Sequence, residues 1–235
     1  MARSLLERSL PDRWRTPLEF WRAYLKGGIE PELFHLRRWA DRMAVAVDIG
    51  ANSGLYSYQL ARWFRQVEAF EPNPRMAACL RRYCCSKIRI HEVALSGCPG
   101  VAPLNIPISS RGVEYAGWGT MDRDGLSWAD DVRVDTVALA TLDSLELEQI
   151  AVIKIDVEGH ECEVLTGGRK TITHWKPVIL IEVKPPSRCF VDNFFKQHNY
   201  KLFTLSGQVL KPLVQDWTLD LSLPENIFAL PAEDA

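Results

Sequence analysis

The sequence contains no run that approaches the ~20 consecutive apolar residues needed to cross a membrane. Near its start, Glu7 and Arg8 interrupt the leucines that could form the apolar part of a secretory signal. Charge of one sign is not in excess, because 28 basic residues face 30 acidic ones and the formal net charge is −2. A protein that binds nucleic acid usually carries a strongly basic face. These absences predict a cytoplasmic protein that neither spans a membrane nor binds nucleic acid.

The cysteines follow no metal-binding or disulfide pattern. None of the six stands in a Cys-X-X-Cys pair, and Cys84 directly precedes Cys85, which suits neither a zinc site nor a disulfide scaffold. We therefore expect reduced thiols at Cys79, Cys84, Cys85, Cys98, Cys162 and Cys189.

The chain is long enough for one domain with a large core, because it has 235 residues of which 47% are hydrophobic. We expect an N-terminal helical appendage over 1–42 and the main domain over 43–235. Within the appendage, Gly27 and Gly28 followed by Pro31 divide two helices. Its many aromatic residues are expected to pack on the core. A lid over a ligand, or an amphipathic contact with a membrane or partner, is the alternative.

From residue 43 onward, apolar strand patterns alternate with helical patterns, which is typical of a parallel sheet with helices on both faces. The predicted fold is therefore α/β and Rossmann-like, with a doubly wound sheet. An unusually long connection over 96–143 carries two further strand-like segments and forms a β insertion between strands three and four. Strands are predicted over 44–48, 67–71, 88–93, 101–108, 132–139, 151–156, 178–183, 200–205 and 226–230, and helices over 55–65, 74–83 and 161–165, the last continuing toward residue 168.

The turn after the first strand has the sequence DIGANSG and begins at Asp48. A buried strand, a glycine-containing turn and a helix in this order present backbone N–H groups to a small ligand. The pattern is not the dinucleotide fingerprint GxGxxG, because Asn52 stands where the second glycine admits a pyrophosphate. An acidic strand end with a polar turn suits a ligand that carries an amino group and a positive centre. S-adenosylmethionine fits that description.

Glu71 lies 23 residues beyond Asp48, at the end of the second predicted strand and before Pro72. An acidic residue at about this distance typically accepts hydrogen bonds from the hydroxyl groups of a ribose. The two features together favour a ligand that contains a nucleoside.

Six segments together resemble the FkbM-type methyltransferases over roughly residues 43–205. This resemblance implies the seven-stranded sheet of class I methyltransferases, with an antiparallel final strand. It also implies S-adenosylmethionine as cofactor and methyl transfer to a hydroxyl group of a sugar, glycoconjugate or natural product. The segments are VDIGANSG (47–54), AFEPNP (69–74), VALS (93–96), TLDSL (141–145), IKIDVEGHECEVLTGG (153–168) and PVILIEV (177–183).

Ligands of open α/β sheets bind beyond the carboxyl ends of the strands, so the residues at those ends should share one cleft. The methionine part of the cofactor is expected over the glycine turn and its ribose at Glu71. Adenine is expected between residues 72–73 and the backbone of 93–96. The predicted cofactor-binding residues are Asp48, Gly50, Asn52, Gly54, Glu71, Pro72, Asn73, Ala94 and Asp156.

Methyl transfer is an in-line displacement, so the protein mainly aligns the reactants and excludes water. A hydroxyl acceptor must also lose its proton, and His160 is a candidate base because imidazole titrates near neutral pH. Asp156 or Glu158 could orient His160 or act in its place, and His160 could instead be a helix cap. Alternatively, Asp156, Glu158 and Glu182 could hold a divalent metal ion that polarises the acceptor oxygen.

Two further residues are candidates for acceptor binding. Trp118, in the long connection, could stack on the apolar face of a sugar ring or simply pack on the domain. Glu182, in an apolar strand, could face the acceptor or pair with Lys184. An O-methyltransferase with a small hydroxylated, saccharide-containing acceptor is the favoured interpretation. The alternatives are a noncatalytic module that binds the cofactor and, less favoured without GxGxxG, a nicotinamide-dependent oxidoreductase.

Overall fold

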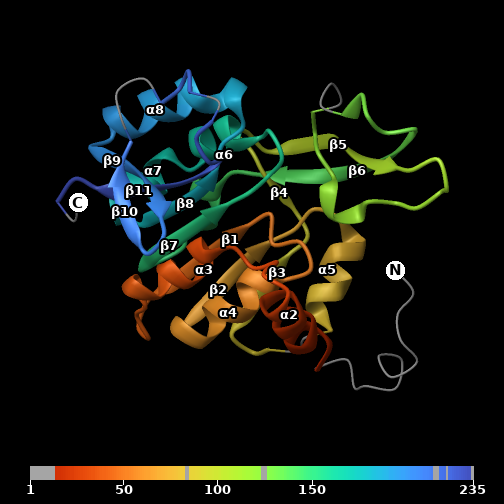
Figure 1. The fold of residues 1–235 in the computed structure, drawn as a ribbon, viewed down its shortest axis with the longest axis horizontal. Coiled ribbons are helices and arrows are strands. Elements are labelled where there is room, and N and C mark those ends of the chain that lie inside the picture. The colour runs from red at the N-terminus through yellow and green to blue at the C-terminus, as the bar shows by residue number, and fades with distance from the viewer. Residues whose placement is uncertain (1–13, 83–84, 123–125, 214–216, 221, 234–235) are drawn as a thin grey trace.

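The computed structural model describes residues 14–82, 85–122, 126–213, 217–220 and 222–233 (Figure 1). Its main sheet has eight strands in the order β10-β9-β11-β8-β7-β1-β2-β3. Strand β11 is antiparallel to its neighbours β8 and β9, whereas β3, β2, β1, β7 and β8 run parallel. The seven expected strands are present, and β10 adds an eighth by pairing with β9. The strands are β1 (Val45–Ile49), β2 (Gln66–Phe70), β3 (Ile88–His91), β7 (Ile150–Ile155), β8 (Val178–Glu182), β9 (Tyr200–Ser206), β10 (Val209–Pro212) and β11 (Asn226–Pro231).

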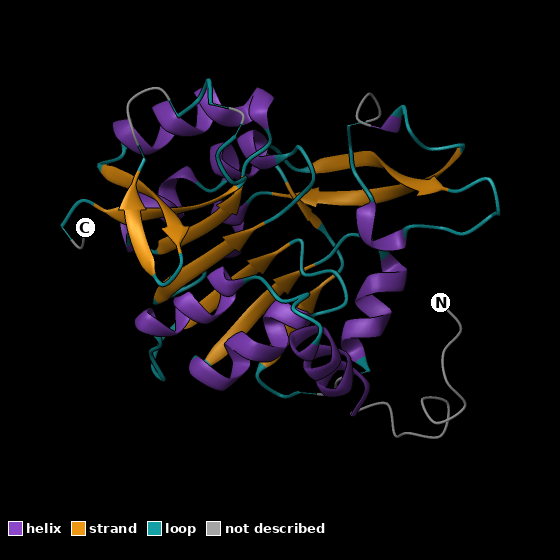
Figure 2. Cartoon of the chain, in the orientation of Figure 1, coloured by secondary structure: helices purple, strands orange, loops and turns teal. Residues whose placement is uncertain are grey.

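Helices cover both faces of this sheet (Figure 2), which confirms the doubly wound arrangement. Side chains of β1 alternate between the two faces: Val47 and Ile49 belong to the core under α6, α7 and α8, and Ala46 to the core under α4 and α5. Because both faces are buried, the strands are nearly continuous apolar runs. The helices are α4 (Leu55–Trp63), α5 (Pro74–Arg81), α6 (Glu161–Gly167), α7 (Arg169–Trp175) and α8 (Arg188–Gln197).

The described part of the N-terminal appendage consists of α2 (Arg15–Leu25), α3 (Pro31–His35) and the 3-10 turn η2 (Leu36–Trp39). Phe20 and Leu33 pack against Tyr58 of α4, and Leu36 joins the core under α4 and α5. The expected helix break is present at Gly27, whose φ is +69°. Residues 1–13 of the predicted appendage lie outside the described residues.

A second, smaller sheet with the order β4-β6-β5 lies beside the main sheet (Figure 1). It consists of β4 (Ala94–Leu95), β5 (Gly100–Ile108) and β6 (Asp131–Ala140), and the two long strands match the predicted strand-like segments. Between β5 and β6 the chain forms the 3-10 turn η3 (Ala116–Trp118), which returns toward the glycine turn after β1.

None of the helices in the described part of the chain is long and apolar enough to cross a membrane. Free thiols are present at Cys79, Cys85, Cys98, Cys162 and Cys189, and Cys84 lies outside the described residues.

Candidate active site

A hollow opens at the carboxyl ends of β1, β2 and β7, between the main sheet and the η3 turn. Most of the predicted cofactor-binding residues meet there, although they come from segments far apart in the sequence. Trp118 and Glu158 also contribute to its wall. The predicted cofactor-binding residues that line this first hollow are Gly50, Asn52, Glu71, Pro72, Asn73, Ala94 and Asp156.

Gly50 shapes the floor of the first hollow because no side chain fits at its position. Its φ is +76°, and an added Cβ would lie 1.8 Å from the carbonyl oxygen of Asp156. The turn is fixed on both sides: the Gly50 N–H donates to the Phe70 carbonyl at 3.0 Å, and the Asp156 N–H donates to the Ile49 carbonyl at 3.1 Å. A glycine is therefore required where β1, β2 and β7 converge.

Two residues of the same turn do not reach the first hollow, which corrects their predicted contact with the cofactor. Asp48 is fully buried, and its Oδ2 accepts a hydrogen bond of 2.5 Å from the Ser57 hydroxyl. Burial raises the pKa of Asp48, although Lys154 and Ser57 oppose the shift. Gly54 precedes the first residue of α4 and has a φ of +88°. Because it has no side chain, Leu80 of α5 can pack closely against it. Asp48 and Gly54 therefore support the turn through contacts with α4 and α5 and do not line the first hollow.

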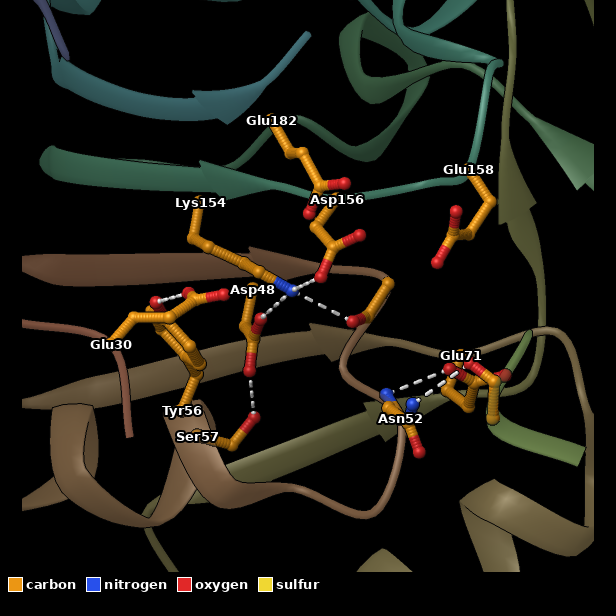
Figure 3. A network of polar contacts seen from close by, with 12 residues as sticks. Glu30, Asp48, Asn52, Tyr56, Ser57, Glu71, Lys154, Asp156, Glu158 and Glu182 are labelled. Carbon is orange, nitrogen blue, oxygen red and sulfur yellow. Dashed lines mark hydrogen bonds and ion pairs between the residues drawn. The ribbon is translucent and has the colours of Figure 1, made fainter. Parts of the chain in front are cut away.

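Lys154, for which the sequence predicts no role, joins β7 to the turn after β1 (Figure 3). Its ammonium group donates to the Gly50 carbonyl at 2.9 Å and lies 3.2 Å from Asp156 Oδ2 and 3.7 Å from Asp48 Oδ1. It also lies 5.1 Å from the centre of the Tyr56 ring. Burial acts to lower the pKa of Lys154, but Asp156 and Asp48 together hold it above its ordinary value.

Glu71 presents its carboxylate to the first hollow in a fixed orientation (Figure 3). Oε2 accepts a hydrogen bond from the Asn52 N–H at 2.7 Å, and Oε1 accepts one from the Asn73 N–H at 2.8 Å. Burial raises the pKa of Glu71 to about 6, although both N–H donors favour the ionised form. Each oxygen keeps a further lone pair for a ligand.

Two asparagine side chains tie the η3 turn over the first hollow. Asn52 Nδ2 donates to the Gly117 carbonyl at 3.0 Å, and Asn73 Nδ2 donates to the Ala116 carbonyl at 2.8 Å. A Cβ on Gly117 would lie 2.7 Å from Asn52 Nδ2, so a side chain there would displace the Asn52 amide. The segment between β5 and β6 is thereby connected to the glycine turn after β1, which the sequence pattern did not reveal.

The three candidates for proton transfer are placed differently. Asp156 and Glu158 line the first hollow. His160 lies outside it: its Nε2 is 2.9 Å from the Ser96 hydroxyl, and its Nδ1 is 3.5 Å from Glu163. Burial lowers the pKa of His160, although Glu163 opposes the shift. The structure therefore places the His160 ring against Ser96 and Glu163, apart from the two carboxylates that line the first hollow.

Carboxylates expected at an acceptor or metal site are instead paired with lysines. Glu182 lies 2.5 Å from Lys184, the residue named above as its alternative to an acceptor contact. Burial and the nearby Asp156 raise the pKa of Glu182 to about 7. Glu158 lies 3.8 Å from Lys184, and Asp156 is paired with Lys154. Among the described residues, no group of three or more His, Cys, Asp and Glu side chains is placed to hold a metal ion.

A second hollow, with a volume of about 520 Å³, adjoins the first. Trp118 and Trp128 form part of its wall, and their ring centres are 5.5 Å apart at an angle of 73°. Tyr115 packs against both rings, at 5.7 Å from Trp118 and 5.9 Å from Trp128. Glu182, the other residue predicted to face the acceptor, lines neither of these two hollows.

Comparison with known proteins connects this geometry to one enzyme family. The family model described as the methyltransferase FkbM domain matches residues 48–202. The chain is 32% identical over 143 residues to the 2-O-methyltransferase NoeI of Sinorhizobium fredii, covering 55% of this chain and 59% of that protein. It is 30% identical over 177 residues to the methyltransferase sdnD of Sordaria araneosa, covering 60% of this chain and 66% of that protein. The chain thus spans about three fifths to two thirds of the length of these relatives.

A solved structure shares the fold. The crystal structure of methyltransferase FkbM from Methylobacillus flagellatus KT superposes with a TM-score of 0.54 and 16% sequence identity. The superposition covers 80% of this chain and 44% of that chain.

Proposed function

The chain belongs to the FkbM methyltransferase family, and from this premise we propose that it transfers a methyl group from S-adenosylmethionine to a hydroxyl group of a small, saccharide-containing acceptor. The observation that carries the proposal is the convergence of Gly50, Glu71 and Asp156 on the first hollow. We assign the methyltransferase domain to 43–235, with 1–42 as its appendage.

The donors and acceptors of the first hollow suit an adenosyl amino acid. Both Glu71 oxygens can accept from ribose hydroxyl groups, and the Asp156 carboxylate can attract the ammonium group of the methionine part. Gly50 and Asn52 would support that part, while Pro72, Asn73 and the backbone at Ala94 would surround adenine. When bound, S-adenosylmethionine supplies a methyl group activated by its sulfonium centre.

The chain's own contribution would be to hold the reactants in line and to keep water away. Transfer to oxygen is supported by the relative named a 2-O-methyltransferase, and a carboxylate at the first hollow can accept the hydroxyl proton. A saccharide acceptor is supported by Trp118, whose ring is half-exposed beside the first hollow. A noncatalytic role is the alternative, in which the nucleoside binds without methyl transfer.

Calorimetric titration with S-adenosylhomocysteine tests the cofactor assignment. We expect the unaltered chain to bind it and Glu71→Gln to bind it at least about tenfold more weakly, since an amide replaces one charged acceptor. The NH₂ group of the substituted side chain would also face a backbone N–H donor at Asn52 or Asn73.

Glu68→Gln is the matched control, because Glu68 is a buried carboxylate of β2, the strand that Glu71 follows. Glu68 contacts Arg89 and His91 and does not line the first hollow, so its substitution should leave the affinity within about twofold. If the unaltered chain fails to bind S-adenosylhomocysteine, the proposed function is wrong. Equal losses in both variants would contradict the role given to Glu71.

A further inference from the structure

The two hollows meet at a shared wall. Of the described residues, Trp118 and Glu158 line both, and Glu158 is the ionisable one. Methyl transfer requires the acceptor oxygen and the methyl carbon to approach in line, so the reaction must occur where a cofactor site opens onto an acceptor site. The junction at Glu158 is such a place.

Glu158 is held at this junction by its backbone. The residue follows β7 with φ +50°, a left-handed conformation that is uncommon for a side chain of this type, and Gly159 follows with φ +100°. The Thr120 hydroxyl donates to the Glu158 carbonyl at 2.7 Å, which ties the turn to the segment after η3. In Figure 3 the Glu158 carboxylate points from its strand-end turn toward the side where Glu71 lies.

The second hollow combines aromatic walls with an excess of negative charge. The side chains of Trp118 and Trp128 are half-exposed, and their ring faces attract the C–H groups of a sugar. Among the described residues of this wall, Asp122 and Glu158 carry carboxylates and Lys184 carries an ammonium group, which lies 3.8 Å from Glu158. Acidic groups therefore outnumber basic ones among these residues, and an anionic acceptor would be repelled.

We propose that the second hollow is the acceptor site, that it takes an uncharged pyranose ring, and that Glu158 is the catalytic base. This inference rests on the proposed function. In the step, the acceptor oxygen forms a bond to the methyl carbon while the carbon–sulfur bond breaks. The electron pair of the broken bond goes to sulfur. The hydroxyl proton passes to the Glu158 carboxylate and from there to water.

The electrostatic surroundings of Glu158 agree with this role. Burial and the nearby Asp156 raise the pKa of Glu158 above its ordinary value, whereas Lys184 opposes the shift. A carboxylate that is less acidic than usual accepts a proton more readily near neutral pH.

The test uses the full chain with isotopically labelled S-adenosylmethionine and two sets of probes: neutral methyl hexopyranosides and the methyl hexuronosides of matching configuration. Binding of each glycoside without cofactor is measured by saturation-transfer NMR. We expect at least one neutral glycoside to bind and be methylated, at a rate about tenfold or more above its hexuronoside partner. Trp128→Ala should raise the KM of that glycoside without changing the affinity for S-adenosylhomocysteine.

Glu158→Gln should lower kcat about 100-fold or more, with the affinity for S-adenosylhomocysteine retained. Glu225→Gln is the matched control, because it removes another carboxylate beside Lys184 that lines neither hollow, and it should leave kcat within about twofold. If the unaltered chain does not bind S-adenosylhomocysteine, the proposed function itself fails. If it binds, the inference fails when Glu158→Gln keeps its turnover, when the hexuronosides are preferred, or when no neutral glycoside is bound and methylated.

Discussion

Replacement of Lys154 by methionine is expected to lower the free energy of unfolding by about 3–5 kcal/mol. Methionine keeps an unbranched side chain only one heavy atom shorter than that of lysine, so the loss would come mainly from the charge and its hydrogen bond. Without the ammonium group, the fully buried Asp48 keeps Ser57 as a neutral donor but has no positive partner. The Gly50 carbonyl would also lose its donor at 2.9 Å. Urea denaturation of the variant and the unaltered chain measures the difference.

Lys196→Met is the matched control for this variant. Lys196 pairs with Asp192 at 2.7 Å, but its side chain is 60% exposed, so we expect a loss of about 1 kcal/mol or less. Asp48→Asn combined with Lys154→Met should cost less than the two changes added together, because a neutral amide no longer needs a positive partner. A Lys154→Met chain that is no less stable than Lys196→Met would refute the role of the buried network.

Gly50→Ala is expected to abolish measurable binding of S-adenosylhomocysteine and to destabilise the fold by about 3 kcal/mol or more. The added methyl group would overlap the Asp156 carbonyl, which lies 1.8 Å from the Cβ position. Neither neighbour can withdraw cheaply, because β2 and β7 both bind the turn through backbone hydrogen bonds. The first hollow would therefore lose the floor on which the methionine part is expected to lie.

Gly27→Ala separates the backbone effect from the steric effect. Gly27 has a similar φ of +69°, but a Cβ there would meet no atom within 4 Å. We expect it to cost only about 1–2 kcal/mol, which is the cost of the left-handed conformation, and to leave cofactor affinity unchanged. Calorimetry and urea denaturation of both variants provide the comparison. Retention of S-adenosylhomocysteine affinity in Gly50→Ala would contradict the placement of the cofactor.

The parts of the site that could be predicted from sequence are those that depend on strand ends. Parallel strands buried on both faces are continuous apolar runs, so the ends of β1, β2 and β7 and the residues just beyond them are visible in the sequence. Glu71 and Asp156 follow such ends and do line the first hollow. Asp48 is the last residue but one of β1, whose last residue, Ile49, lines the first hollow. Successive side chains of a strand point to opposite faces, so the buried Asp48 side chain points away from the face that Ile49 occupies.

The parts that could not be predicted depend on contacts between distant segments. Lys154 is separated from Gly50 by 104 residues, and the available signal was a single basic residue inside an apolar strand, which burial requires to be paired. Trp118 and Trp128 meet within the long connection between β5 and β6, where no periodic pattern indicates which side chains face each other. Helices α7 and α8 were also missed: α7 follows α6 with only Gly168 between them, and the start of α8 follows two prolines that resemble a loop.

A structure of the chain with bound S-adenosylhomocysteine would show whether the first hollow holds the cofactor. We expect the ligand in the first hollow, with its ribose hydroxyl groups within hydrogen-bonding distance of Glu71 and its sulfur facing Glu158. Occupation of the second hollow instead, or an empty first hollow at a saturating ligand concentration, would contradict it.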